Sequence, residues 1–267
     1  MVGAWLVGVA AAGSWGKDVE PSWGSDGVED GKRLSVQDPI VLGDLALFPV
    51  IDREASGRAE LDVTTLGDGM ARGTAAVRES ANGVVDTLVV VNRSPEPLLV
   101  MAGDVVHGGM QDRVFQDSLL VAGGASRAVP VRCVERGRWT AERPGFVYAG
   151  RVDPALRAVV ATGSQEQTWS AVAARNRATG AGDAASWLAG RDLDPRELAA
   201  AEQALAQRFA DDKRVVGVVV ARGGTFTGAE VYPHPALFAQ DHLAVLSGQL
   251  AAAPATPATR LAGVPSK

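Results

Sequence analysis

The sequence predicts an α+β protein, with a β-rich first half and helices packed on it. Before Trp139, short apolar runs rich in β-branched residues are separated by Gly and Asn-Gly turn signals. After Pro144 the pattern changes to helix-starting signals and helical periodicity. Near the C-terminus, Val215–Ala221 and Phe226–Tyr232 flank Gly223-Gly224 and predict a returning hairpin. We therefore expect a sandwich-like or barrel-like β-rich part, helices, and a C-terminal hairpin with a last helix.

The chain has 267 residues, of which 46% are hydrophobic, so it can bury a large core. We predict a tail and linker over 1–39, a single domain over 40–250 and a disordered tail over 251–267. Residues 1–16 resemble a secretory signal in their apolar stretch and Ala-rich end, but no Lys or Arg precedes the stretch. This segment is too short to span a membrane. Cytoplasmic and exported locations therefore both stay open.

Charge excludes one class of partner and points to another. A net charge of -5 argues against general nucleic-acid binding, which depends on Lys and Arg neutralising phosphates. Between Arg127 and Arg157, however, seven arginines stand against three acidic residues. Guanidinium groups bind phosphate or carboxylate through a planar fork of donors. The segment predicts an anion site, unless these arginines face solvent or pair with nearby acids.

The sequence indicates neither a disulfide nor a metal site. A single cysteine excludes an intramolecular disulfide and a Cys-rich zinc site. Three histidines, His107, His234 and His242, show no metal-ligand spacing. A carboxylate-only magnesium or calcium site needs no such spacing and stays open. No cofactor is indicated, and the oligomeric state is not either.

The first half is expected to form about six strands before Trp139. Pro49 marks an edge, or the end, of the first of these strands. Ala81-Asn82-Gly83 supplies a hairpin turn. The expected elements are strands at Leu45–Ile51, Thr74–Glu79, Val84–Asn92 and Leu98–Met101, and a short helix at 65–72 that Thr64 or Thr65 caps and Gly73 ends.

The most polar stretch, 103–139, predicts another hairpin. Val114–Val121 and Val129–Val134 are apolar runs joined by Gly123-Gly124, which supplies the turn. The polar segments Gly108–Arg113 and Glu135–Trp139 would then lie at the same edge of the sheet. Their side chains would converge there.

Helix caps are clear in the second half. Asp153-Pro154 is a cap followed by a first-turn proline, and it opens a helix to about Thr162. Ser164 and Gln167 have the spacing of a capping box. Asp194-Pro195 with Glu197 opens a helix to about Ala210, with an apolar stripe at Leu198, Leu205 and Phe209. The last helix is expected at Pro235–Leu250.

Asp104 and Glu135 are the candidate acid and base. Each lies at the end of an apolar strand, where partial burial would raise its pKa toward neutrality. The alternative is an ordinary ion pair with Arg113 or Arg138, because structural pairs perturb pKa values too. His107 is a weaker candidate, as a proton shuttle.

Arg113 and Arg138 are candidates to bind a phosphate, and Gln111 to orient a ligand or water. Trp139 and Trp169 could stack a base. The alternatives are salt bridges, loop hydrogen bonds and packing. Cys133 lies in a strand, and a free cysteine is more often core than nucleophile.

Several ordered strings resemble the family of ADP-ribosylglycohydrolase- and rhodanese-phosphatase-associated proteins, over about 45–250. Members usually have an acid at the position of Asp104 and often Asn at that of Asp112. The resemblance implies a component of ADP-ribose-derivative metabolism, without a settled catalytic mechanism. The matching residues are Gly103-Asp104, Gly109-Met-Gln111-Asp112-Arg113, Val131-Arg-Cys133-Val-Glu135-Arg-Gly137-Arg138-Trp139, Arg157, and Gln165 with Trp169.

Two functions follow. The first is binding, with hydrolysis, of a phosphorylated small molecule related to ADP-ribose, with Arg113 and Arg138 on the anion and Asp104 and Glu135 as acid and base. The second is a non-catalytic ligand-sensing or interaction module, in which the same cluster holds strand ends together. Geometry distinguishes them: an enzyme needs these side chains around one open pocket, whereas the module needs them paired and closed to solvent.

Overall fold

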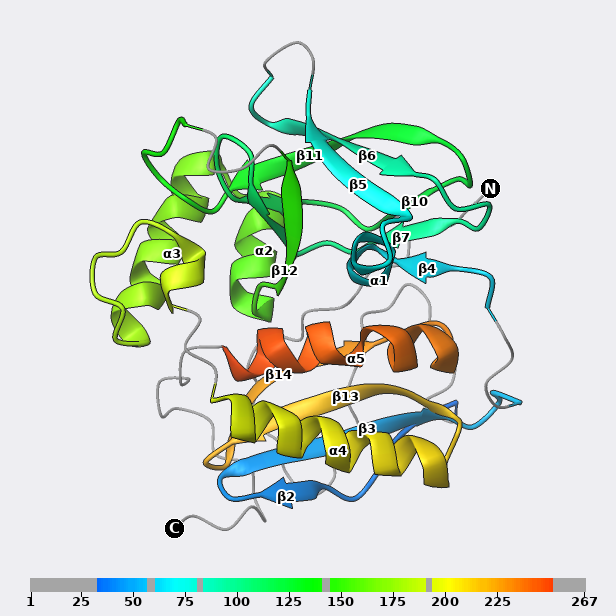
Figure 1. Cartoon of the computed structure of the whole chain (residues 1–267). Helices are drawn as coiled ribbons and strands as arrows, with labels where there is room; N and C mark the ends of the chain where they lie inside the picture. Colours follow the sequence, from blue (N-terminus) through cyan, green and yellow to red (C-terminus); the bar gives the residue numbers. More distant parts are fainter. Residues whose placement is uncertain (1–32, 57–60, 81–83, 141–144, 191–193, 252–267) are drawn as a thin grey trace. The chain divides into compact units, whose positions relative to one another are not determined.

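The structure is a computed structural model that describes residues 33–56, 61–80, 84–140, 145–190 and 194–251. It confirms the α+β class, with sheets curled like half-barrels and several helices (Figure 1). The described residues divide into two compact units: those between 33 and 61 and between 194 and 249 form the first, and those between 62 and 190, with 250 and 251, form the second. The single domain over 40–250 stays a prediction. A domain is defined by its ability to fold on its own, which a division into compact units does not test. The signal-like segment and the C-terminal tail lie outside the described residues.

The first unit is a five-stranded antiparallel sheet with two helices. Its order is β1-β3-β13-β14, and β2 also pairs with β3. Figure 1 shows α4 crossing in front of β3, and the Phe209 ring of α4 meets Phe238 of α5 edge-on at 5.4 Å. The elements are β1 (Leu34–Val36), β2 (Ile40–Leu42), β3 (Leu45–Asp52), β13 (Val215–Arg222), β14 (Thr225–Val231), α4 (Pro195–Asp211) and α5 (Pro235–Leu250).

Two predictions for this unit need correction. The folded chain starts before Ile40, because β1 already pairs with β3. Pro49 lies in an interior strand, not at an edge. Its carbonyl accepts the backbone N–H of Gln37 at 2.8 Å, so its donor-less nitrogen faces the break between β1 and β2. Proline is tolerated there because no ladder hydrogen bond is lost.

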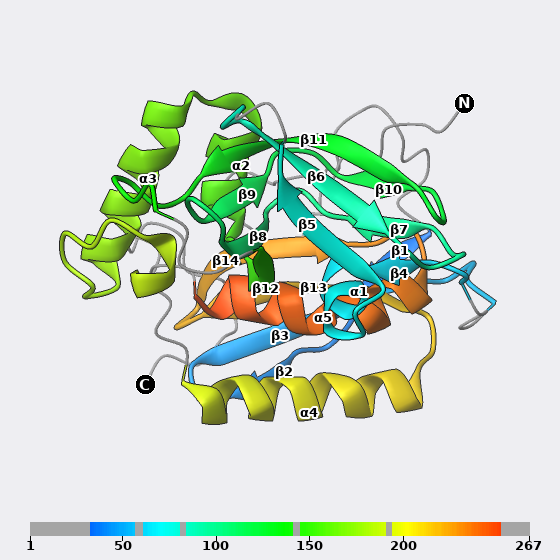
Figure 2. The same cartoon turned by 45° about the horizontal axis from the view of Figure 1, so that its top comes forward.

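The second unit holds a six-stranded sheet of order β12-β8-β9-β11-β6-β5 and a three-stranded sheet of order β10-β7-β4. All neighbours pair antiparallel except β4 and β7. Figure 2 shows β11, β6 and β5 side by side at one end of the six-stranded sheet. The strands are β4 (Thr64–Thr65), β5 (Ala75–Glu79), β6 (Thr87–Asn92), β7 (Leu98–Val100), β8 (Asp104–Gly108), β9 (Arg113–Phe115), β10 (Leu119–Val121), β11 (Ser126–Cys133) and β12 (Phe146–Arg151).

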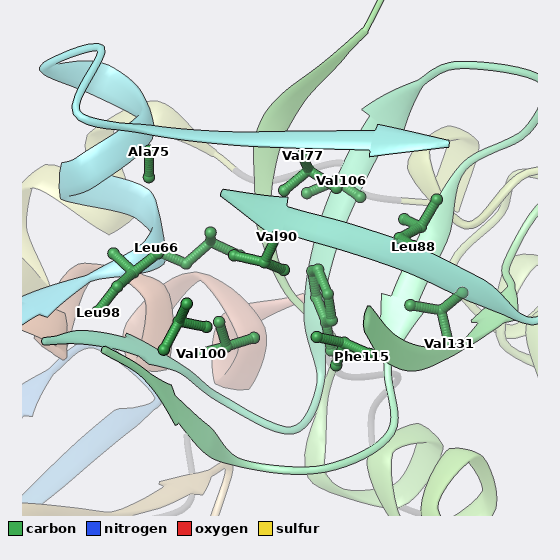
Figure 3. Packing of buried hydrophobic residues seen from close by; sticks show 12 residues of the cluster. Leu66, Ala75, Val77, Leu88, Val90, Leu98, Val100, Val106, Phe115 and Val131 are labelled. Carbon is green, nitrogen blue, oxygen red and sulfur yellow. The ribbon is translucent and has the colours of Figure 1, made fainter. Parts of the chain in front are cut away.

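Strand alternation divides the buried residues of this unit into two cores. Val106 and Phe115 point into one cluster, whereas their neighbours Val105 and Val114 point into the other. Figure 3 shows the first cluster, where Phe115 lies between strands of the two sheets. The second cluster packs against α2 (Pro154–Thr162) and α3 (Gln165–Ala178). Both faces of β8 and β9 are therefore buried, and their ends are held firmly.

The hairpin predicted for the polar stretch is only partly correct. Gly124 does take a positive φ of 70° in a turn, but the strands on its two sides join different partners. The polar residues 116–118 interrupt the first run, because the Ser118 hydroxyl accepts the Ala102 N–H at 2.9 Å. Only β9 pairs with β11. The remainder, β10, pairs with β7.

Strand content is also higher than predicted. Eleven strands, β1 to β11, precede Trp139 in the described chain, not six. Residues after Pro144 form strand β12 before any helix, which contradicts the predicted change to helix there. The run Phe146-Val147-Tyr148 has the aromatic and β-branched residues of a strand. Its pairing with β8 places Tyr148 and Arg151 beside the start of β8.

The helix predictions are confirmed. Asp153 accepts the N–H of Leu156, and Ser164 and Gln167 form the predicted capping box. Asp194 accepts the N–H of Arg196 at the start of α4. The short helix α1 (Leu66–Ala71) begins after the Thr65 cap. Within the described chain, no helix has the length and apolar run needed to cross a membrane.

Candidate functional site

The two polar segments of the 103–139 stretch converge as predicted. Cys133, the last residue of β11, pairs with Arg113, the first residue of β9. Beyond that pair, the Val134 N–H donates to the Asp112 carbonyl at 3.1 Å. The segment before β9 and the segment after β11 therefore lie side by side, and their side chains form one cluster.

Asp112 lies at the centre of this cluster and is 2% exposed. Its Oδ1 is 2.7 Å from His107 Nδ1 and accepts from Arg138 Nη2 at 3.2 Å. Its Oδ2 accepts from the Ser186 hydroxyl at 3.2 Å. We call His107, Asp112, Glu135 and Arg138 the Asp112 cluster. A buried carboxylate with this many donors is well stabilised, so Asp112 fixes the positions of its neighbours.

Arg138 holds the Asp112 cluster together. Its Nε donates to both carboxylate oxygens of Glu135, at 2.8 and 2.9 Å. Nη1 donates to the carbonyls of Gly109 and Thr140, and Nη2 reaches Asp112. All three guanidinium nitrogens thus bind acceptors of the protein itself. An anion would have to displace them to contact Arg138.

The pKa of Glu135 differs in direction from the prediction. Burial does raise it, but the hydrogen bonds from Arg138 and from the Asp112 N–H, with the positive charge of Arg138, lower it more. The pKa of Glu135 therefore lies below its ordinary value. The carboxyl is ionised at neutral pH and is a poor proton donor.

Asp104 lies in a separate ion pair. Its Oδ1 accepts from Arg151 Nε at 3.0 Å and Nη2 at 2.8 Å, and from the Tyr148 hydroxyl at 3.0 Å. Its Oδ2 accepts the Met101 N–H at 2.9 Å. Asp104 is 2% exposed and Arg151 1%. The ion pair considered from the sequence exists, but with Arg151 rather than with Arg113 or Arg138.

Two residues of the family motifs, Gln165 and Trp169, attach helix α3 to the end of β11. Gln165 accepts the Cys133 N–H and donates to the Cys133 carbonyl, both at 2.8 Å, so its amide continues the strand ladder. Trp169 donates its indole N–H to the Glu135 carbonyl at 3.2 Å. Arg136 lies over the Trp169 ring at 5.3 Å. These contacts hold α3 against the end of β11.

Cys133 and Arg157 are both interior residues. Burial raises the pKa of the Cys133 thiol, which disfavours the thiolate needed for nucleophilic attack. Arg157, on α2, is 4% exposed. A Cβ at Gly103 would lie 3.0 Å from Arg157 Cδ, so the arginine stem packs against this glycine. The absence of a side chain at Gly103 lets α2 approach β8.

The seven arginines of the basic segment do not form one patch. Arg127 and Arg132 donate to the carbonyls of Leu120 and Gly163 respectively. Arg138 and Arg151 are in the two carboxylate clusters, and Arg143 lies outside the described residues. The alternative, in which these arginines face solvent or pair with nearby acids, therefore fits the exposed Arg127 and Arg136 and the paired Arg138 and Arg151 better than a shared anion site.

Arg113 differs from Arg138 and Arg151, which both bind carboxylates. It is 1% exposed, and its hydrogen bonds go to neutral acceptors, the Val85 carbonyl at 3.3 Å and Gln111 Oε1 at 3.5 Å. No carboxylate of the described chain lies within 4.0 Å of its guanidinium nitrogens. Gln111 is fully buried, and its Nε2 has no hydrogen-bond partner among the described residues.

Arg113 also borders a cavity of about 190 Å³. We call it the Arg113 cavity. Its wall includes Trp139, which is 53% exposed. The described lining residues are Glu79, Val84, Val85, Met110, Arg113 and Trp139. A buried cation, an exposed indole and apolar walls therefore meet at one hollow, which Asp104 and Glu135 do not line.

Sequence reasoning missed four residues of these clusters: Tyr148, Arg151, Ser186 and Glu79. Ser186 is 74 positions from Asp112, and Arg151 is 47 from Asp104. A strand prediction for Phe146–Arg151 would have placed Tyr148 and Arg151 on the sheet. No local signal marks Ser186. Nowhere in the described chain do three or more His, Cys, Asp or Glu side chains gather as metal ligands would.

Together, fold and site define an α+β protein in which arginine–carboxylate clusters join strand ends, with a cavity lined by Arg113, whose hydrogen-bond partners in the described chain are neutral. The chain matches the ARG and Rhodanese-Phosphatase-superfamily-associated Protein domain over residues 33–266. It belongs to this family, as the motifs indicated. No curated protein and no solved structure matches it.

Proposed function

We propose that this protein binds a phosphorylated small molecule related to ADP-ribose at the Arg113 cavity, as a non-catalytic ligand-binding module. The observation that carries the proposal is the Arg113 guanidinium, which is 1% exposed and has only neutral hydrogen-bond partners in the described chain. The family's association with ADP-ribosylglycohydrolases supplies the class of ligand.

The burial of the Arg113 charge favours the binding of an anion beside it. A buried charge without a counter-charge costs several kcal/mol in the folded protein. A phosphate at the cavity would offset that cost and accept charge-assisted hydrogen bonds. Arg138 has no such need, because Glu135 and Asp112 already neutralise it. Arg113 is therefore the arginine of the family string that binds the anion in this proposal.

The size of the cavity limits what it can hold. At about 190 Å³ it is smaller than the roughly 300–1,000 Å³ of typical small-molecule sites. The cavity fits the phosphate-bearing end of such a ligand rather than a molecule as large as ADP-ribose. The remainder of the ligand would extend past Trp139, whose exposed indole offers a stacking surface.

The hydrolytic half of the sequence-based hypothesis has less support. Asp104 is held by Arg151 and Tyr148, and Glu135 by Arg138. Each carboxylate would have to leave a buried ion pair to act on a ligand, at a cost of several kcal/mol. Mutual pairing was the arrangement expected of a ligand-sensing module. Binding alone is therefore the function proposed.

A thermal-shift and calorimetric titration with ADP-ribose tests the proposal. We expect ADP-ribose to raise the melting temperature of the wild type, because a ligand of the native state stabilises it. Arg113→Met should abolish this shift while changing the ligand-free melting temperature little, since it removes a charge without a counter-charge. Arg127→Met, at an exposed arginine of β11, is the matched control and should bind normally. Retention of the shift by Arg113→Met would overturn the proposal.

A further inference from the structure

The Arg113 cavity has a second charged lining residue, Glu79, at the end of β5. Its Oε1 accepts the Met110 N–H at 2.9 Å. Its Oε2 has no hydrogen-bond partner among the described residues. One oxygen thus anchors the carboxylate, and the other remains available to an additional donor.

The backbone around Gly109 keeps Glu79 in this position. Gly109 has a φ of 52°, a conformation that favours glycine. A Cβ there would lie 2.6 Å from Glu79 Oε1 and would also collide with the Phe146 ring. The family string therefore carries a glycine where any side chain would displace the carboxylate. The lining carboxylate is part of a built arrangement.

Glu79 and Arg113 line one cavity without forming an ion pair within 4.0 Å. A plain anion would gain from the guanidinium but would be repelled by the carboxylate. A ligand that offers an anion to Arg113 and hydrogen-bond donors to Glu79 satisfies both. Sugar hydroxyls are such donors, and acidic side chains bind ribose hydroxyls in nucleotide-binding folds.

We propose that Glu79 is a specificity-determining residue that selects a ribose phosphate with its 2-hydroxyl over a deoxyribose phosphate or a bare phosphate. The inference rests on the proposed function and adds the group that distinguishes one phosphorylated ligand from another. The apolar side chains of Val84, Val85 and Met110, with Trp139, line the same cavity and cover the C–H faces of the sugar.

Ribose 5-phosphate and 2-deoxyribose 5-phosphate are the probes, because they differ by one hydroxyl. Calorimetry should show that the wild type binds ribose 5-phosphate about tenfold or more tightly, the ratio for one hydrogen bond to a charged group. Glu79→Gln should bring this ratio close to one. Its amide oxygen can still accept the Met110 N–H, so the melting temperature should be unchanged.

The comparison of the two sugars in the wild type does not depend on any variant folding. Equal affinity for the two sugar phosphates would overturn the role of Glu79, and so would an affinity ratio that Glu79→Gln leaves unchanged. If binding still depended on Arg113 in either case, the proposed function would stand. Tighter binding of phosphoethanolamine than of ribose 5-phosphate would assign Glu79 to an ammonium group and also overturn it. Failure of every phosphate probe to bind in an Arg113-dependent way would overturn both proposals.

Discussion

Arg138 and Arg113 lie in neighbouring segments of the polar stretch, yet the protein uses them differently. Arg138 donates to Glu135, Asp112 and backbone carbonyls. Arg113 is more deeply buried and, in the described chain, meets only neutral acceptors beside a cavity. The comparison teaches that charge content alone does not mark a binding site. In our proposal the binding site is marked instead by Arg113, a buried charge for which the described chain offers no counter-charge within 4.0 Å.

The largest effect is expected where a buried pair is broken. Asp104→Ala leaves Arg151, which is 1% exposed, without its carboxylate. We expect the free energy of unfolding to fall by about 3–5 kcal/mol, as measured by chemical denaturation. Arg113→Met is the matched comparison and should change it much less. Similar losses for the two variants would remove the distinction between paired and unneutralised arginines.

The Asp112 cluster should behave as one unit. Arg138→Lys keeps the charge but loses the planar fork, and Glu135→Gln removes the charge that the fork binds. Each should lower the free energy of unfolding by about 1.5–3 kcal/mol, the range for hydrogen bonds to charged groups. The double variant should lose less than the sum, because the residues share one interaction. Additive losses of unfolding free energy would mean that Arg138 and Glu135 have no interaction energy with each other.

The same pair predicts a pH dependence. The pKa of Glu135 is lower in the folded protein than its ordinary value, so as pH falls the unfolded chain takes up the proton first. The stabilisation by ionised Glu135 is complete above the unfolded pKa, about 4.3, and is lost as pH falls through the folded pKa. The stability difference between wild type and Glu135→Gln should therefore shrink below about pH 4. A constant difference would contradict the pairing.

The smallest effect is expected at a helix cap that belongs to neither arginine cluster and does not line the Arg113 cavity. Asp194→Ala removes the side chain that accepts the Arg196 N–H at 2.8 Å at the start of α4. The loss of this cap should cost about 1 kcal/mol of unfolding free energy. Affinity for ADP-ribose should not change. A stability change near zero would show that the cap contributes little to α4.

Local signals predicted much of the fold and less of the site. Caps at Asp153, Ser164 and Asp194 mark helix starts because they act within three residues. The partners of Asp104 come from β12 through strand pairing, which no local pattern contains. The lowered pKa of Glu135 could not be predicted from the sequence either. Burial is readable from an apolar strand, but the opposing hydrogen bonds depend on where Arg138 and the Asp112 backbone lie.

The contrast between the two arginines can be measured most directly by titrating ADP-ribose into Arg113→Lys and Arg138→Lys. Lysine keeps the charge and removes the bidentate fork in both. We predict that Arg113→Lys weakens binding by about 1.5–3 kcal/mol with little loss of stability. Arg138→Lys should lower stability and leave affinity unchanged. The reverse pattern, with affinity lost at Arg138 and retained at Arg113, would contradict the assignment of the anion to Arg113.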